Sequence, residues 1–362
     1  MPLRPAVLRL EPYRPQRPLR ELQRELGLER LVKLASNEGA FGPLPGAVAA
    51  FEGAAAELNR YPDGGGLRLR EALAERHGVP VEQIVLGNGA DELIRFCAVV
   101  TLEPGDRAVF PWPSFPSYPA SAAACGAEEV RVPLAGRRFD LDAVLAECRP
   151  PAKLVYLANP NNPIGTLLDA GSLRSFLDAL PESVLCVLDE AYAEYADPAP
   201  EGIELVRAGR PGLCVLRTFS KVYGLAALRV GYAITSAEVA DGLDRVRPIF
   251  NVGQPSQEAA LASLAEHGEI AGRVRHAHRA RERLREALAS AGLEPEPSQA
   301  NFVYADVPGG DGEALAERLL HAGFVVRGLT GFGAPGAIRV TAGTDEENEL
   351  FAAALPRVVS AG

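Results

Sequence analysis

Between residues 45 and 250 the sequence alternates stretches of helical periodicity with short runs of apolar residues. Three of these runs are clear, at residues 153–158, 184–188 and 213–216, and each is about as long as a buried strand. Nearly continuous apolar strands that alternate with helices are typical of a parallel sheet covered by helices on both faces. The pattern therefore predicts a large α/β domain with a mostly parallel sheet.

After Gln254 the order of the predicted elements changes. Helices are predicted at 256–266, 270–291, 312–322 and 346–359, and strands at 301–307, 324–327 and 337–341. This mixture predicts a second, smaller α+β domain. Residues 1–42 are rich in proline, with one predicted helix at 19–27, and we expect them to form an arm that packs with the small domain. The predicted organisation is an arm at 1–42, a large domain at 43–252 and a small domain at 253–362.

Composition narrows the class of protein. The net charge of −10 disfavours a nucleic-acid-binding protein, which usually presents a basic face. Five scattered cysteines without a C-x-x-C pair suit a reducing compartment, and no signal peptide or apolar run of membrane length is visible. His276 and His278 would point to different sides of a helix, so no metal site is expected. We expect a cytoplasmic protein without nucleic-acid or membrane partners.

Lysine is rare in this chain. Only Lys33, Lys153 and Lys221 occur, among 37 lysines and arginines together. A position that keeps lysine where arginine is otherwise used can require a primary amine, which arginine cannot supply. Lys221 directly follows a predicted buried strand, so it is the strongest candidate for such a role.

Polar side chains follow each of the three clear strands. Asn162 lies after the first strand, Asp189 and Tyr192 lie at the end of the second, and Ser220 and Lys221 follow the third. Ligands of open parallel sheets bind beyond the carboxyl ends of the strands. We therefore expect these five side chains to converge on one pocket.

The chemistry of these side chains suits an aromatic aldehyde. The Lys221 amine can form a Schiff base with an aldehyde. Asp189 lies at the end of a predicted buried strand, where a carboxylate is costly unless it is paired with a cation such as a protonated pyridine nitrogen. Asn162 and Tyr192 can donate hydrogen bonds to a phenolate oxygen.

Other residues suit a phosphate group. Ser220 and Arg229 can bind it directly, and the backbone N–H groups of Ala90 and Asp91 would face an anion at a predicted helix N-terminus. Phe115 can stack on an aromatic ring. An aldehyde, a pyridinium, a phenolate and a phosphate occur together in pyridoxal phosphate.

Each of these residues also has a purely structural interpretation. Asp189 can be a helix N-cap, Asn162 can make an Asn-Pro turn, Phe115 can be a core residue and Lys221 can be a surface cation. Taken alone, Asn162 fits a turn and a ligand site equally well. The joint occurrence of these residues after consecutive strands favours the cofactor site.

Four motifs carry a resemblance to a known family. They are N-P-N-N-P-I-G at 159–165, D-E-A-Y at 189–192, S-K at 220–221 and A-L-R-V-G-Y at 227–232, and they resemble those of fold-type I, class II aminotransferases that depend on pyridoxal phosphate. More narrowly, the chain resembles the histidinol-phosphate aminotransferases. That match includes E-P-Y-R-P at 11–15, L-A-S-N-E at 34–38, R-Y-P-D at 60–63, G-N-G-A-D-E at 87–92, V-R-P-I-F-N at 246–251, V-V-R at 325–327 and I-R-V-T-A-G-T at 338–344.

The resemblance implies a role for each candidate residue. Lys221 would be the Schiff-base lysine and, with Asp189 and Tyr192, catalytic. The implied cofactor contacts are Ala90, Asp91, Phe115, Asn162, Asp189, Tyr192, Ser220, Lys221, Arg229 and, from a neighbouring subunit of a homodimer, Tyr61. The implied substrate contacts are Tyr13, Asn37, Arg327 and Arg339.

The implied reaction is transamination of L-histidinol phosphate, the amino donor, with the 2-oxo acid 2-oxoglutarate. Its products are imidazole acetol phosphate and glutamate, in histidine biosynthesis. An aminotransferase for aromatic or other α-amino acids is the first alternative, and a decarboxylase of the phosphothreonine type is the second.

Overall fold

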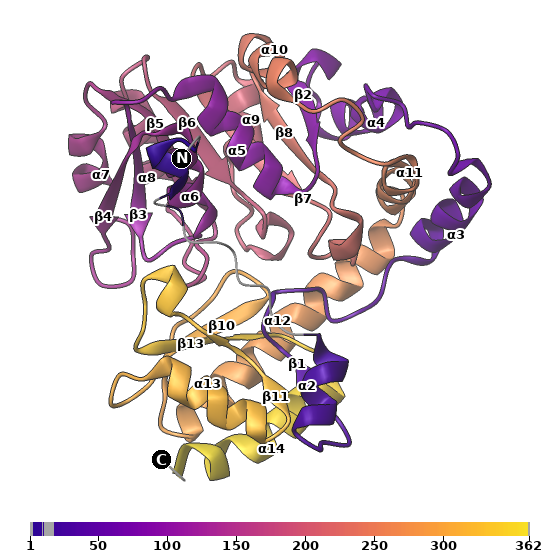
Figure 1. Cartoon of the computed structure of the whole chain (residues 1–362), viewed down its shortest axis with the longest axis vertical. Helices are drawn as coiled ribbons and strands as arrows, with labels where there is room; N and C mark the ends of the chain where they lie inside the picture. The colour runs from indigo at the N-terminus through magenta and orange to yellow at the C-terminus, as the bar shows by residue number, and fades with distance from the viewer. Residues whose placement is uncertain (1–2, 9, 11–17, 361–362) are drawn as a thin grey trace.

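The computed structural model describes residues 3–8, 10 and 18–360, and its larger part is built around a seven-stranded sheet (Figure 1). The strand order is β2-β8-β7-β6-β5-β3-β4. The strands are β2 (Ile84–Gly87), β3 (Arg107–Trp112), β4 (Glu128–Pro133), β5 (Ala152–Ala158), β6 (Leu185–Asp189), β7 (Leu213–Thr218) and β8 (Gly231–Thr235). Strand β8 is antiparallel to both neighbours and the other pairings are parallel, which confirms the predicted mostly parallel sheet.

Helices cover both faces of this sheet. Alternate residues of β5 show why its sequence is continuously apolar: Leu154 and Tyr156 belong to one hydrophobic core, and Val155 and Leu157 belong to the other. The helices of this part are α3 (Pro45–Ala54), α4 (Leu67–His77), α5 (Ala90–Thr101), α6 (Ser117–Cys125), α7 (Leu141–Glu147), α8 (Ala170–Ala179), α9 (Gly202–Arg207), α10 (Ala237–Val246) and α11 (Gln254–Ser263). None of the helices in the described part of the chain combines the length and the apolar character needed to cross a membrane.

The smaller part contains a four-stranded antiparallel sheet in the order β12-β13-β10-β9. Its elements are β9 (Glu294–Pro295), β10 (Phe302–Asp306), α13 (Gly312–His321), β12 (Arg327–Gly328), β13 (Ala337–Thr341) and α14 (Asp345–Ser360). The single strand predicted at 324–327 is wrong: it is two short strands, β11 (Phe324–Val325) and β12, separated by Val326. They differ because β11 pairs with β1 (Val32–Lys33) of the N-terminal arm, whereas β12 pairs with β13.

The arm contacts both parts of the molecule. Strand β1 pairs with β11, and Leu34 lies in the core of the smaller part. Helix α2 (Leu19–Glu25) precedes β1. The arm was expected to pack with the small domain, but α1 (Pro5–Leu8) lies at the larger part, where Arg4 beside it donates a hydrogen bond to the carbonyl oxygen of Ala124 in α6, 2.8 Å away.

Helix α12 (His267–Ser290) joins the two parts (Figure 1). Ile270 and Ala277 lie in a core of the seven-stranded sheet, whereas Ala280 and Leu284 lie in the core of the smaller part. Packing therefore changes within α12, after the predicted boundary at 252/253. The division of the chain into domains stays a prediction.

Candidate active site

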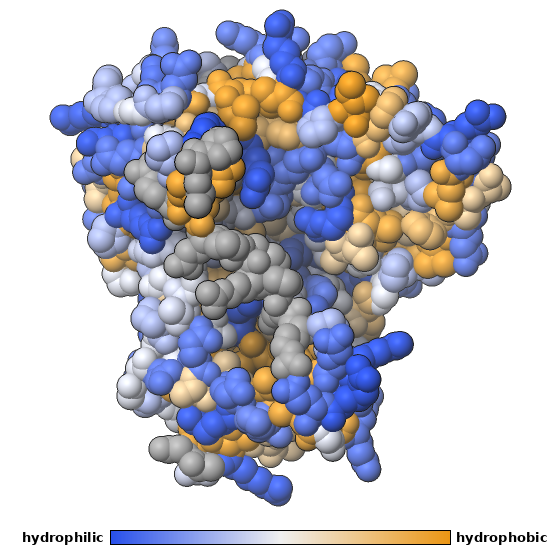
Figure 2. Space-filling model, in the orientation of Figure 1, coloured by the Kyte–Doolittle hydropathy of each residue, from blue (hydrophilic) through white to orange (hydrophobic). Residues whose placement is uncertain are grey.

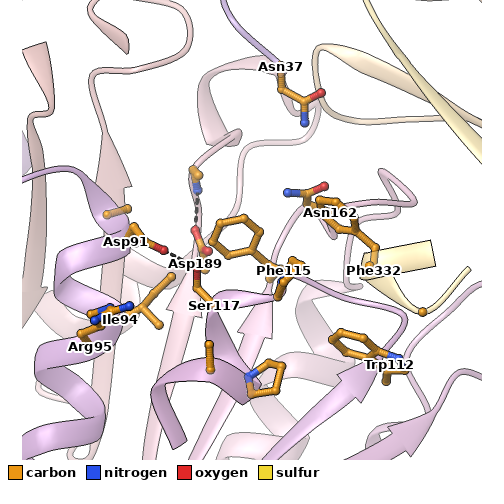
Figure 3. Close-up of a pocket in the computed structure, with 18 of the residues that line it drawn as sticks. Asn37, Asp91, Ile94, Arg95, Trp112, Phe115, Ser117, Asn162, Asp189 and Phe332 are labelled. Carbon is orange, nitrogen blue, oxygen red and sulfur yellow. Dashed lines mark hydrogen bonds between the residues drawn. The ribbon is translucent and has the colours of Figure 1, made fainter. Parts of the chain in front are cut away.

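A cavity of about 1540 Å³ lies at the carboxyl ends of the central strands, where the two parts of the molecule meet (Figure 3). The predicted site residues that line it are Asn37, Ala90, Asp91, Phe115, Asn162, Asp189, Tyr192, Ser220, Lys221, Arg229, Arg327 and Arg339. Tyr61 is not among the described residues of the lining: it is 82% exposed, and its ring stacks on that of Phe250 at 4.7 Å. Tyr13 lies outside the described residues.

Lys221 follows β7 and lines the cavity. Its Nζ lies 3.5 Å from the carbonyl oxygen of Ser36 and 5.4 Å from the centre of the Tyr192 ring. Burial, and next the nearby Arg339 guanidinium, lower the pKa of Lys221 to about 7. The amine therefore loses its proton near neutral pH, which is the form that attacks an aldehyde.

Asp189 is the last residue of β6, and its carboxylate is buried (Figure 3). Oδ2 accepts a hydrogen bond from the Tyr118 hydroxyl at 2.8 Å, and Oδ1 accepts one from the Ala191 N–H at 3.2 Å. Burial raises the pKa of Asp189, and the Tyr118 hydrogen bond partly offsets that rise. None of the described residues forms an ion pair with this carboxylate. A buried carboxylate in this state is stabilised by a cationic ligand.

The start of α5 and Arg229 form an anion cradle. Gly89 precedes the helix with a φ of +79°, a backbone conformation that favours glycine, and a Cβ there would lie 2.4 Å from Nη2 of Arg229 and displace that guanidinium. Arg229 donates a hydrogen bond to the Ser220 hydroxyl at 3.3 Å. The first N–H groups of α5, at Ala90 and Asp91, have no partner within the helix. A helix N-terminus beside an arginine and a hydroxyl suits a phosphate.

Arg339 of β13 provides a buried positive charge in the lining of the cavity. It donates hydrogen bonds to Oδ1 of Asn162 and, at 3.0 Å, to the carbonyl oxygen of Ala35. Burial lowers the pKa of Arg339 to about 10, so the side chain stays charged at neutral pH. Among the described residues, the buried Nε atoms of Arg339 and Arg327 have no hydrogen-bond partner. Two arginines that line one cavity suit an anionic substrate.

Asn37 joins the arm to the segment after β6 and to β13. Its Nδ2 donates to the Tyr192 hydroxyl oxygen at 2.8 Å, and its Oδ1 accepts from the Thr341 hydroxyl at 3.0 Å. Its φ of +54° is one that asparagine tolerates better than most residues. Burial raises the pKa of Tyr192, so the phenol keeps its proton and can donate a hydrogen bond to a ligand.

Several residues that shape the site were not among the predicted site residues. Tyr118 bonds to Asp189, Ser117 donates to Asp91, and Trp112 and Phe332 line the cavity. Tyr118 lies three residues after Phe115, a helical spacing that could have drawn attention to it. No local signal places Phe332, because it reaches the cavity from the smaller part.

The donor set matches pyridoxal phosphate, because each polar group of that molecule finds a partner of complementary type. Lys221 suits its aldehyde, Asp189 its ring nitrogen and the cradle at Gly89 its phosphate. The Nδ2 of Asn162 and the hydroxyl of Tyr192 suit its phenolate oxygen. Fold and site therefore define the class: aminotransferases of fold type I that depend on pyridoxal phosphate.

Comparisons with known proteins agree with this class. The family model described as aminotransferase class I and II matches residues 29–355, and the chain belongs to that family, in which it groups with the histidinol-phosphate aminotransferases. It is 43% identical to "Histidinol-phosphate aminotransferase 1" of Nitrosococcus oceani, over 97% of this chain and 95% of that protein. It is also 43% identical to a histidinol-phosphate aminotransferase of an Anaeromyxobacter species, over the full length of both chains.

A solved structure is similar throughout. The histidinol-phosphate aminotransferase of Sinorhizobium meliloti, in complex with pyridoxal-5'-phosphate, superposes with a TM-score of 0.90 at 33% identity. The superposition covers 99% of this chain and 98% of that one.

Proposed function

We propose that the protein transfers the amino group of L-histidinol phosphate to 2-oxoglutarate, giving imidazole acetol phosphate and glutamate, in histidine biosynthesis. The observation that carries the proposal is the pair of arginines, Arg327 and Arg339, which line the same cavity as Lys221. They suit the phosphate of this donor or a carboxylate of glutamate. The names of relatives of 43% identity support the same reaction.

The proposed roles follow from the groups lining the cavity. Pyridoxal phosphate supplies an aldehyde and an electron-accepting ring when bound. Lys221 would hold the cofactor at its aldehyde; once the amino group of the substrate has replaced the lysine there, the freed amine would take the proton from the substrate carbon that bears the amino group and deliver it on the cofactor side. Asp189 keeps the ring nitrogen protonated, and Asn162 and Tyr192 bind the phenolate oxygen. Phe115 packs on the ring face.

The remaining proposed contacts bind the two anionic ends. Ala90, Asp91, Ser220 and Arg229 hold the cofactor phosphate. Asn37, Arg327 and Arg339 bind the substrate, together with Tyr13, which lies outside the described residues.

We also propose a homodimer in which Tyr61 reaches the phosphate site of the neighbouring subunit. Tyr61, Leu58 and Ile249 are 82%, 67% and 82% exposed, and Figure 2 shows apolar side chains near α3 and α11. Exposed apolar groups of this kind are typical of a contact surface. Ile249→Asp should convert a dimer to a monomer in light scattering, whereas the matched change Val99→Asp, at an exposed position of α5, should not.

A cytoplasmic location is part of the proposal. The five cysteines are free thiols and four of them are buried, which suits a reducing compartment.

An amino-donor panel tests the reaction. Histidinol phosphate should give the highest kcat/KM, ahead of phenylalanine, with 2-oxoglutarate as acceptor. An aminotransferase for aromatic amino acids is the second candidate, because Trp112, Phe115 and Phe332 give the cavity an aromatic lining. A kcat/KM for phenylalanine above that for histidinol phosphate would replace the first proposal by the second.

A further inference from the structure

We propose that Tyr118 is a positioning residue that sets two cofactor contacts at once, through Asp189 and through Phe115. The inference rests on the proposed function, because both of those residues are proposed to touch pyridoxal phosphate. Tyr118 is not among the described residues that line the cavity, so it acts through its neighbours.

The contacts of Tyr118 are direct. Its hydroxyl donates to Oδ2 of Asp189 at 2.8 Å. Its ring meets that of Phe115 edge to face, with centroids 5.8 Å apart and planes at 78°. Tyr118 is completely buried, and burial raises its pKa well above that of a free phenol. The hydroxyl is therefore a donor at every pH at which the enzyme would work.

Tyr118 is itself held in place from behind. Its ring stacks on Tyr156 of β5, with centroids 4.7 Å apart and planes at 5°. The Tyr156 hydroxyl is not part of this stack: it donates to the carbonyl oxygen of Ile94 at 2.8 Å, so a phenylalanine at position 156 keeps the ring that packs on Tyr118. Next to Tyr118, the Ser117 hydroxyl donates to Asp91 at the start of the same helix. The first turn of α6 thus contacts Phe115, Asp189 and Asp91. These are the residues proposed to meet the ring face, the ring nitrogen and the phosphate of the cofactor.

The hydroxyl also sets the charge of Asp189. Burial raises the pKa of that carboxyl, and the hydrogen bond from Tyr118 opposes the rise. Without this donor the carboxylate binds a proton more strongly, so a proton shared with a ring nitrogen moves toward Asp189. The ring then carries less positive charge and withdraws electrons less well. A less positive ring also lets the nitrogen that links Lys221 to the cofactor keep its proton to higher pH.

Tyr118→Phe removes only the hydroxyl, and Tyr156→Phe is the matched control. Both variants lose one fully buried phenol O–H with a 2.8 Å hydrogen bond, but only Tyr118 contacts Asp189. We expect Tyr118→Phe to lower kcat by about tenfold or more, the effect of one hydrogen bond to a charged group, with KM changed less than about twofold. The midpoint of the pH titration of the bound cofactor's visible absorbance should rise, and dialysis should remove the cofactor faster.

The control separates positioning from stability. Both variants should lower the melting temperature by a similar amount, but Tyr156→Phe should keep the wild-type absorbance midpoint, cofactor retention and kcat. A Tyr118→Phe protein with the wild-type midpoint and cofactor retention overturns the inference, and so does a Tyr156→Phe protein with an equal shift. If the wild-type protein binds no pyridoxal phosphate, the proposed function fails first and the role of Tyr118 fails with it.

Discussion

Replacing Asp189 by asparagine should separate activity from stability. The carboxylate lies in a buried position at the end of β6, and none of the described residues forms an ion pair with it. With pyridoxal phosphate bound, the variant loses a buried pair of opposite charges. Breaking such a pair costs about 3–5 kcal/mol, and a factor of ten in rate corresponds to about 1.4 kcal/mol. We therefore expect kcat/KM to fall by about 10² to 10⁴.

The cofactor-free protein should respond in the opposite sense. Burial raises the pKa of Asp189 in the folded state. The folded state therefore binds this proton more strongly than the unfolded state, and the free energy of unfolding falls as the pH rises through the interval between the two pKa values. Asparagine lacks this charge, and it can still accept the Tyr118 hydrogen bond. At neutral pH the cofactor-free variant should melt at or above the wild-type temperature.

Steady-state kinetics and thermal unfolding of the cofactor-free protein test both parts. Asp169→Asn is the matched control, because Asp169 is an exposed N-cap of α8 that accepts from the Ser172 N–H at 2.8 Å, and asparagine caps equally well. It should change neither quantity. Activity of Asp189→Asn within tenfold of wild type, or a melting temperature several degrees lower without cofactor, would refute the reasoning.

Three other perturbations probe the rest of the account. Glu190 is completely buried and lies 2.6 Å from the Arg217 guanidinium, so Arg217→Met leaves this carboxylate without its ion-pair partner. The variant should lower the free energy of unfolding, measured in urea, by about 3–5 kcal/mol, and a loss under about 1 kcal/mol would contradict this. The rate at which the cofactor-free protein binds pyridoxal phosphate should rise with pH around a midpoint of about 7, because Lys221 then loses its proton. Arg339→Gln removes a positive charge near Lys221 and should raise that midpoint; an unchanged midpoint would count against the electrostatic argument. Arg327→Gln should raise KM for histidinol phosphate about tenfold or more without weakening cofactor binding in a fluorescence titration, and equal losses of both would speak against a substrate role.

The position of the site could be predicted because it depends on a rule of parallel sheets. Strands β5, β6 and β7 lie side by side and run in the same direction, so the residues after them reach the same edge. Asn162, Asp189 and Lys221 therefore line one cavity, as expected. Their roles stay predictions.

Contacts between distant segments could not be predicted. Tyr118 meets Asp189 because α6 and β6 come together in the fold, and no periodicity in either segment indicates that pairing. Asn37 was predicted from resemblance, but its hydrogen bonds to Tyr192 and Thr341 depend on three segments meeting. The sequence of residues 324–327 does not indicate which strand each residue pairs with, so its division into β11 and β12 could not be predicted.

The identity of the lysine that binds the cofactor is the most direct test of the account. The chain contains only Lys33, Lys153 and Lys221, so reduction of the protein with borohydride in the presence of pyridoxal phosphate, followed by peptide mass spectrometry, has three possible lysine sites. We predict that the reduced pyridoxyl phosphate group is found on Lys221 alone. A modified Lys33 or Lys153 with an unmodified Lys221 would contradict it.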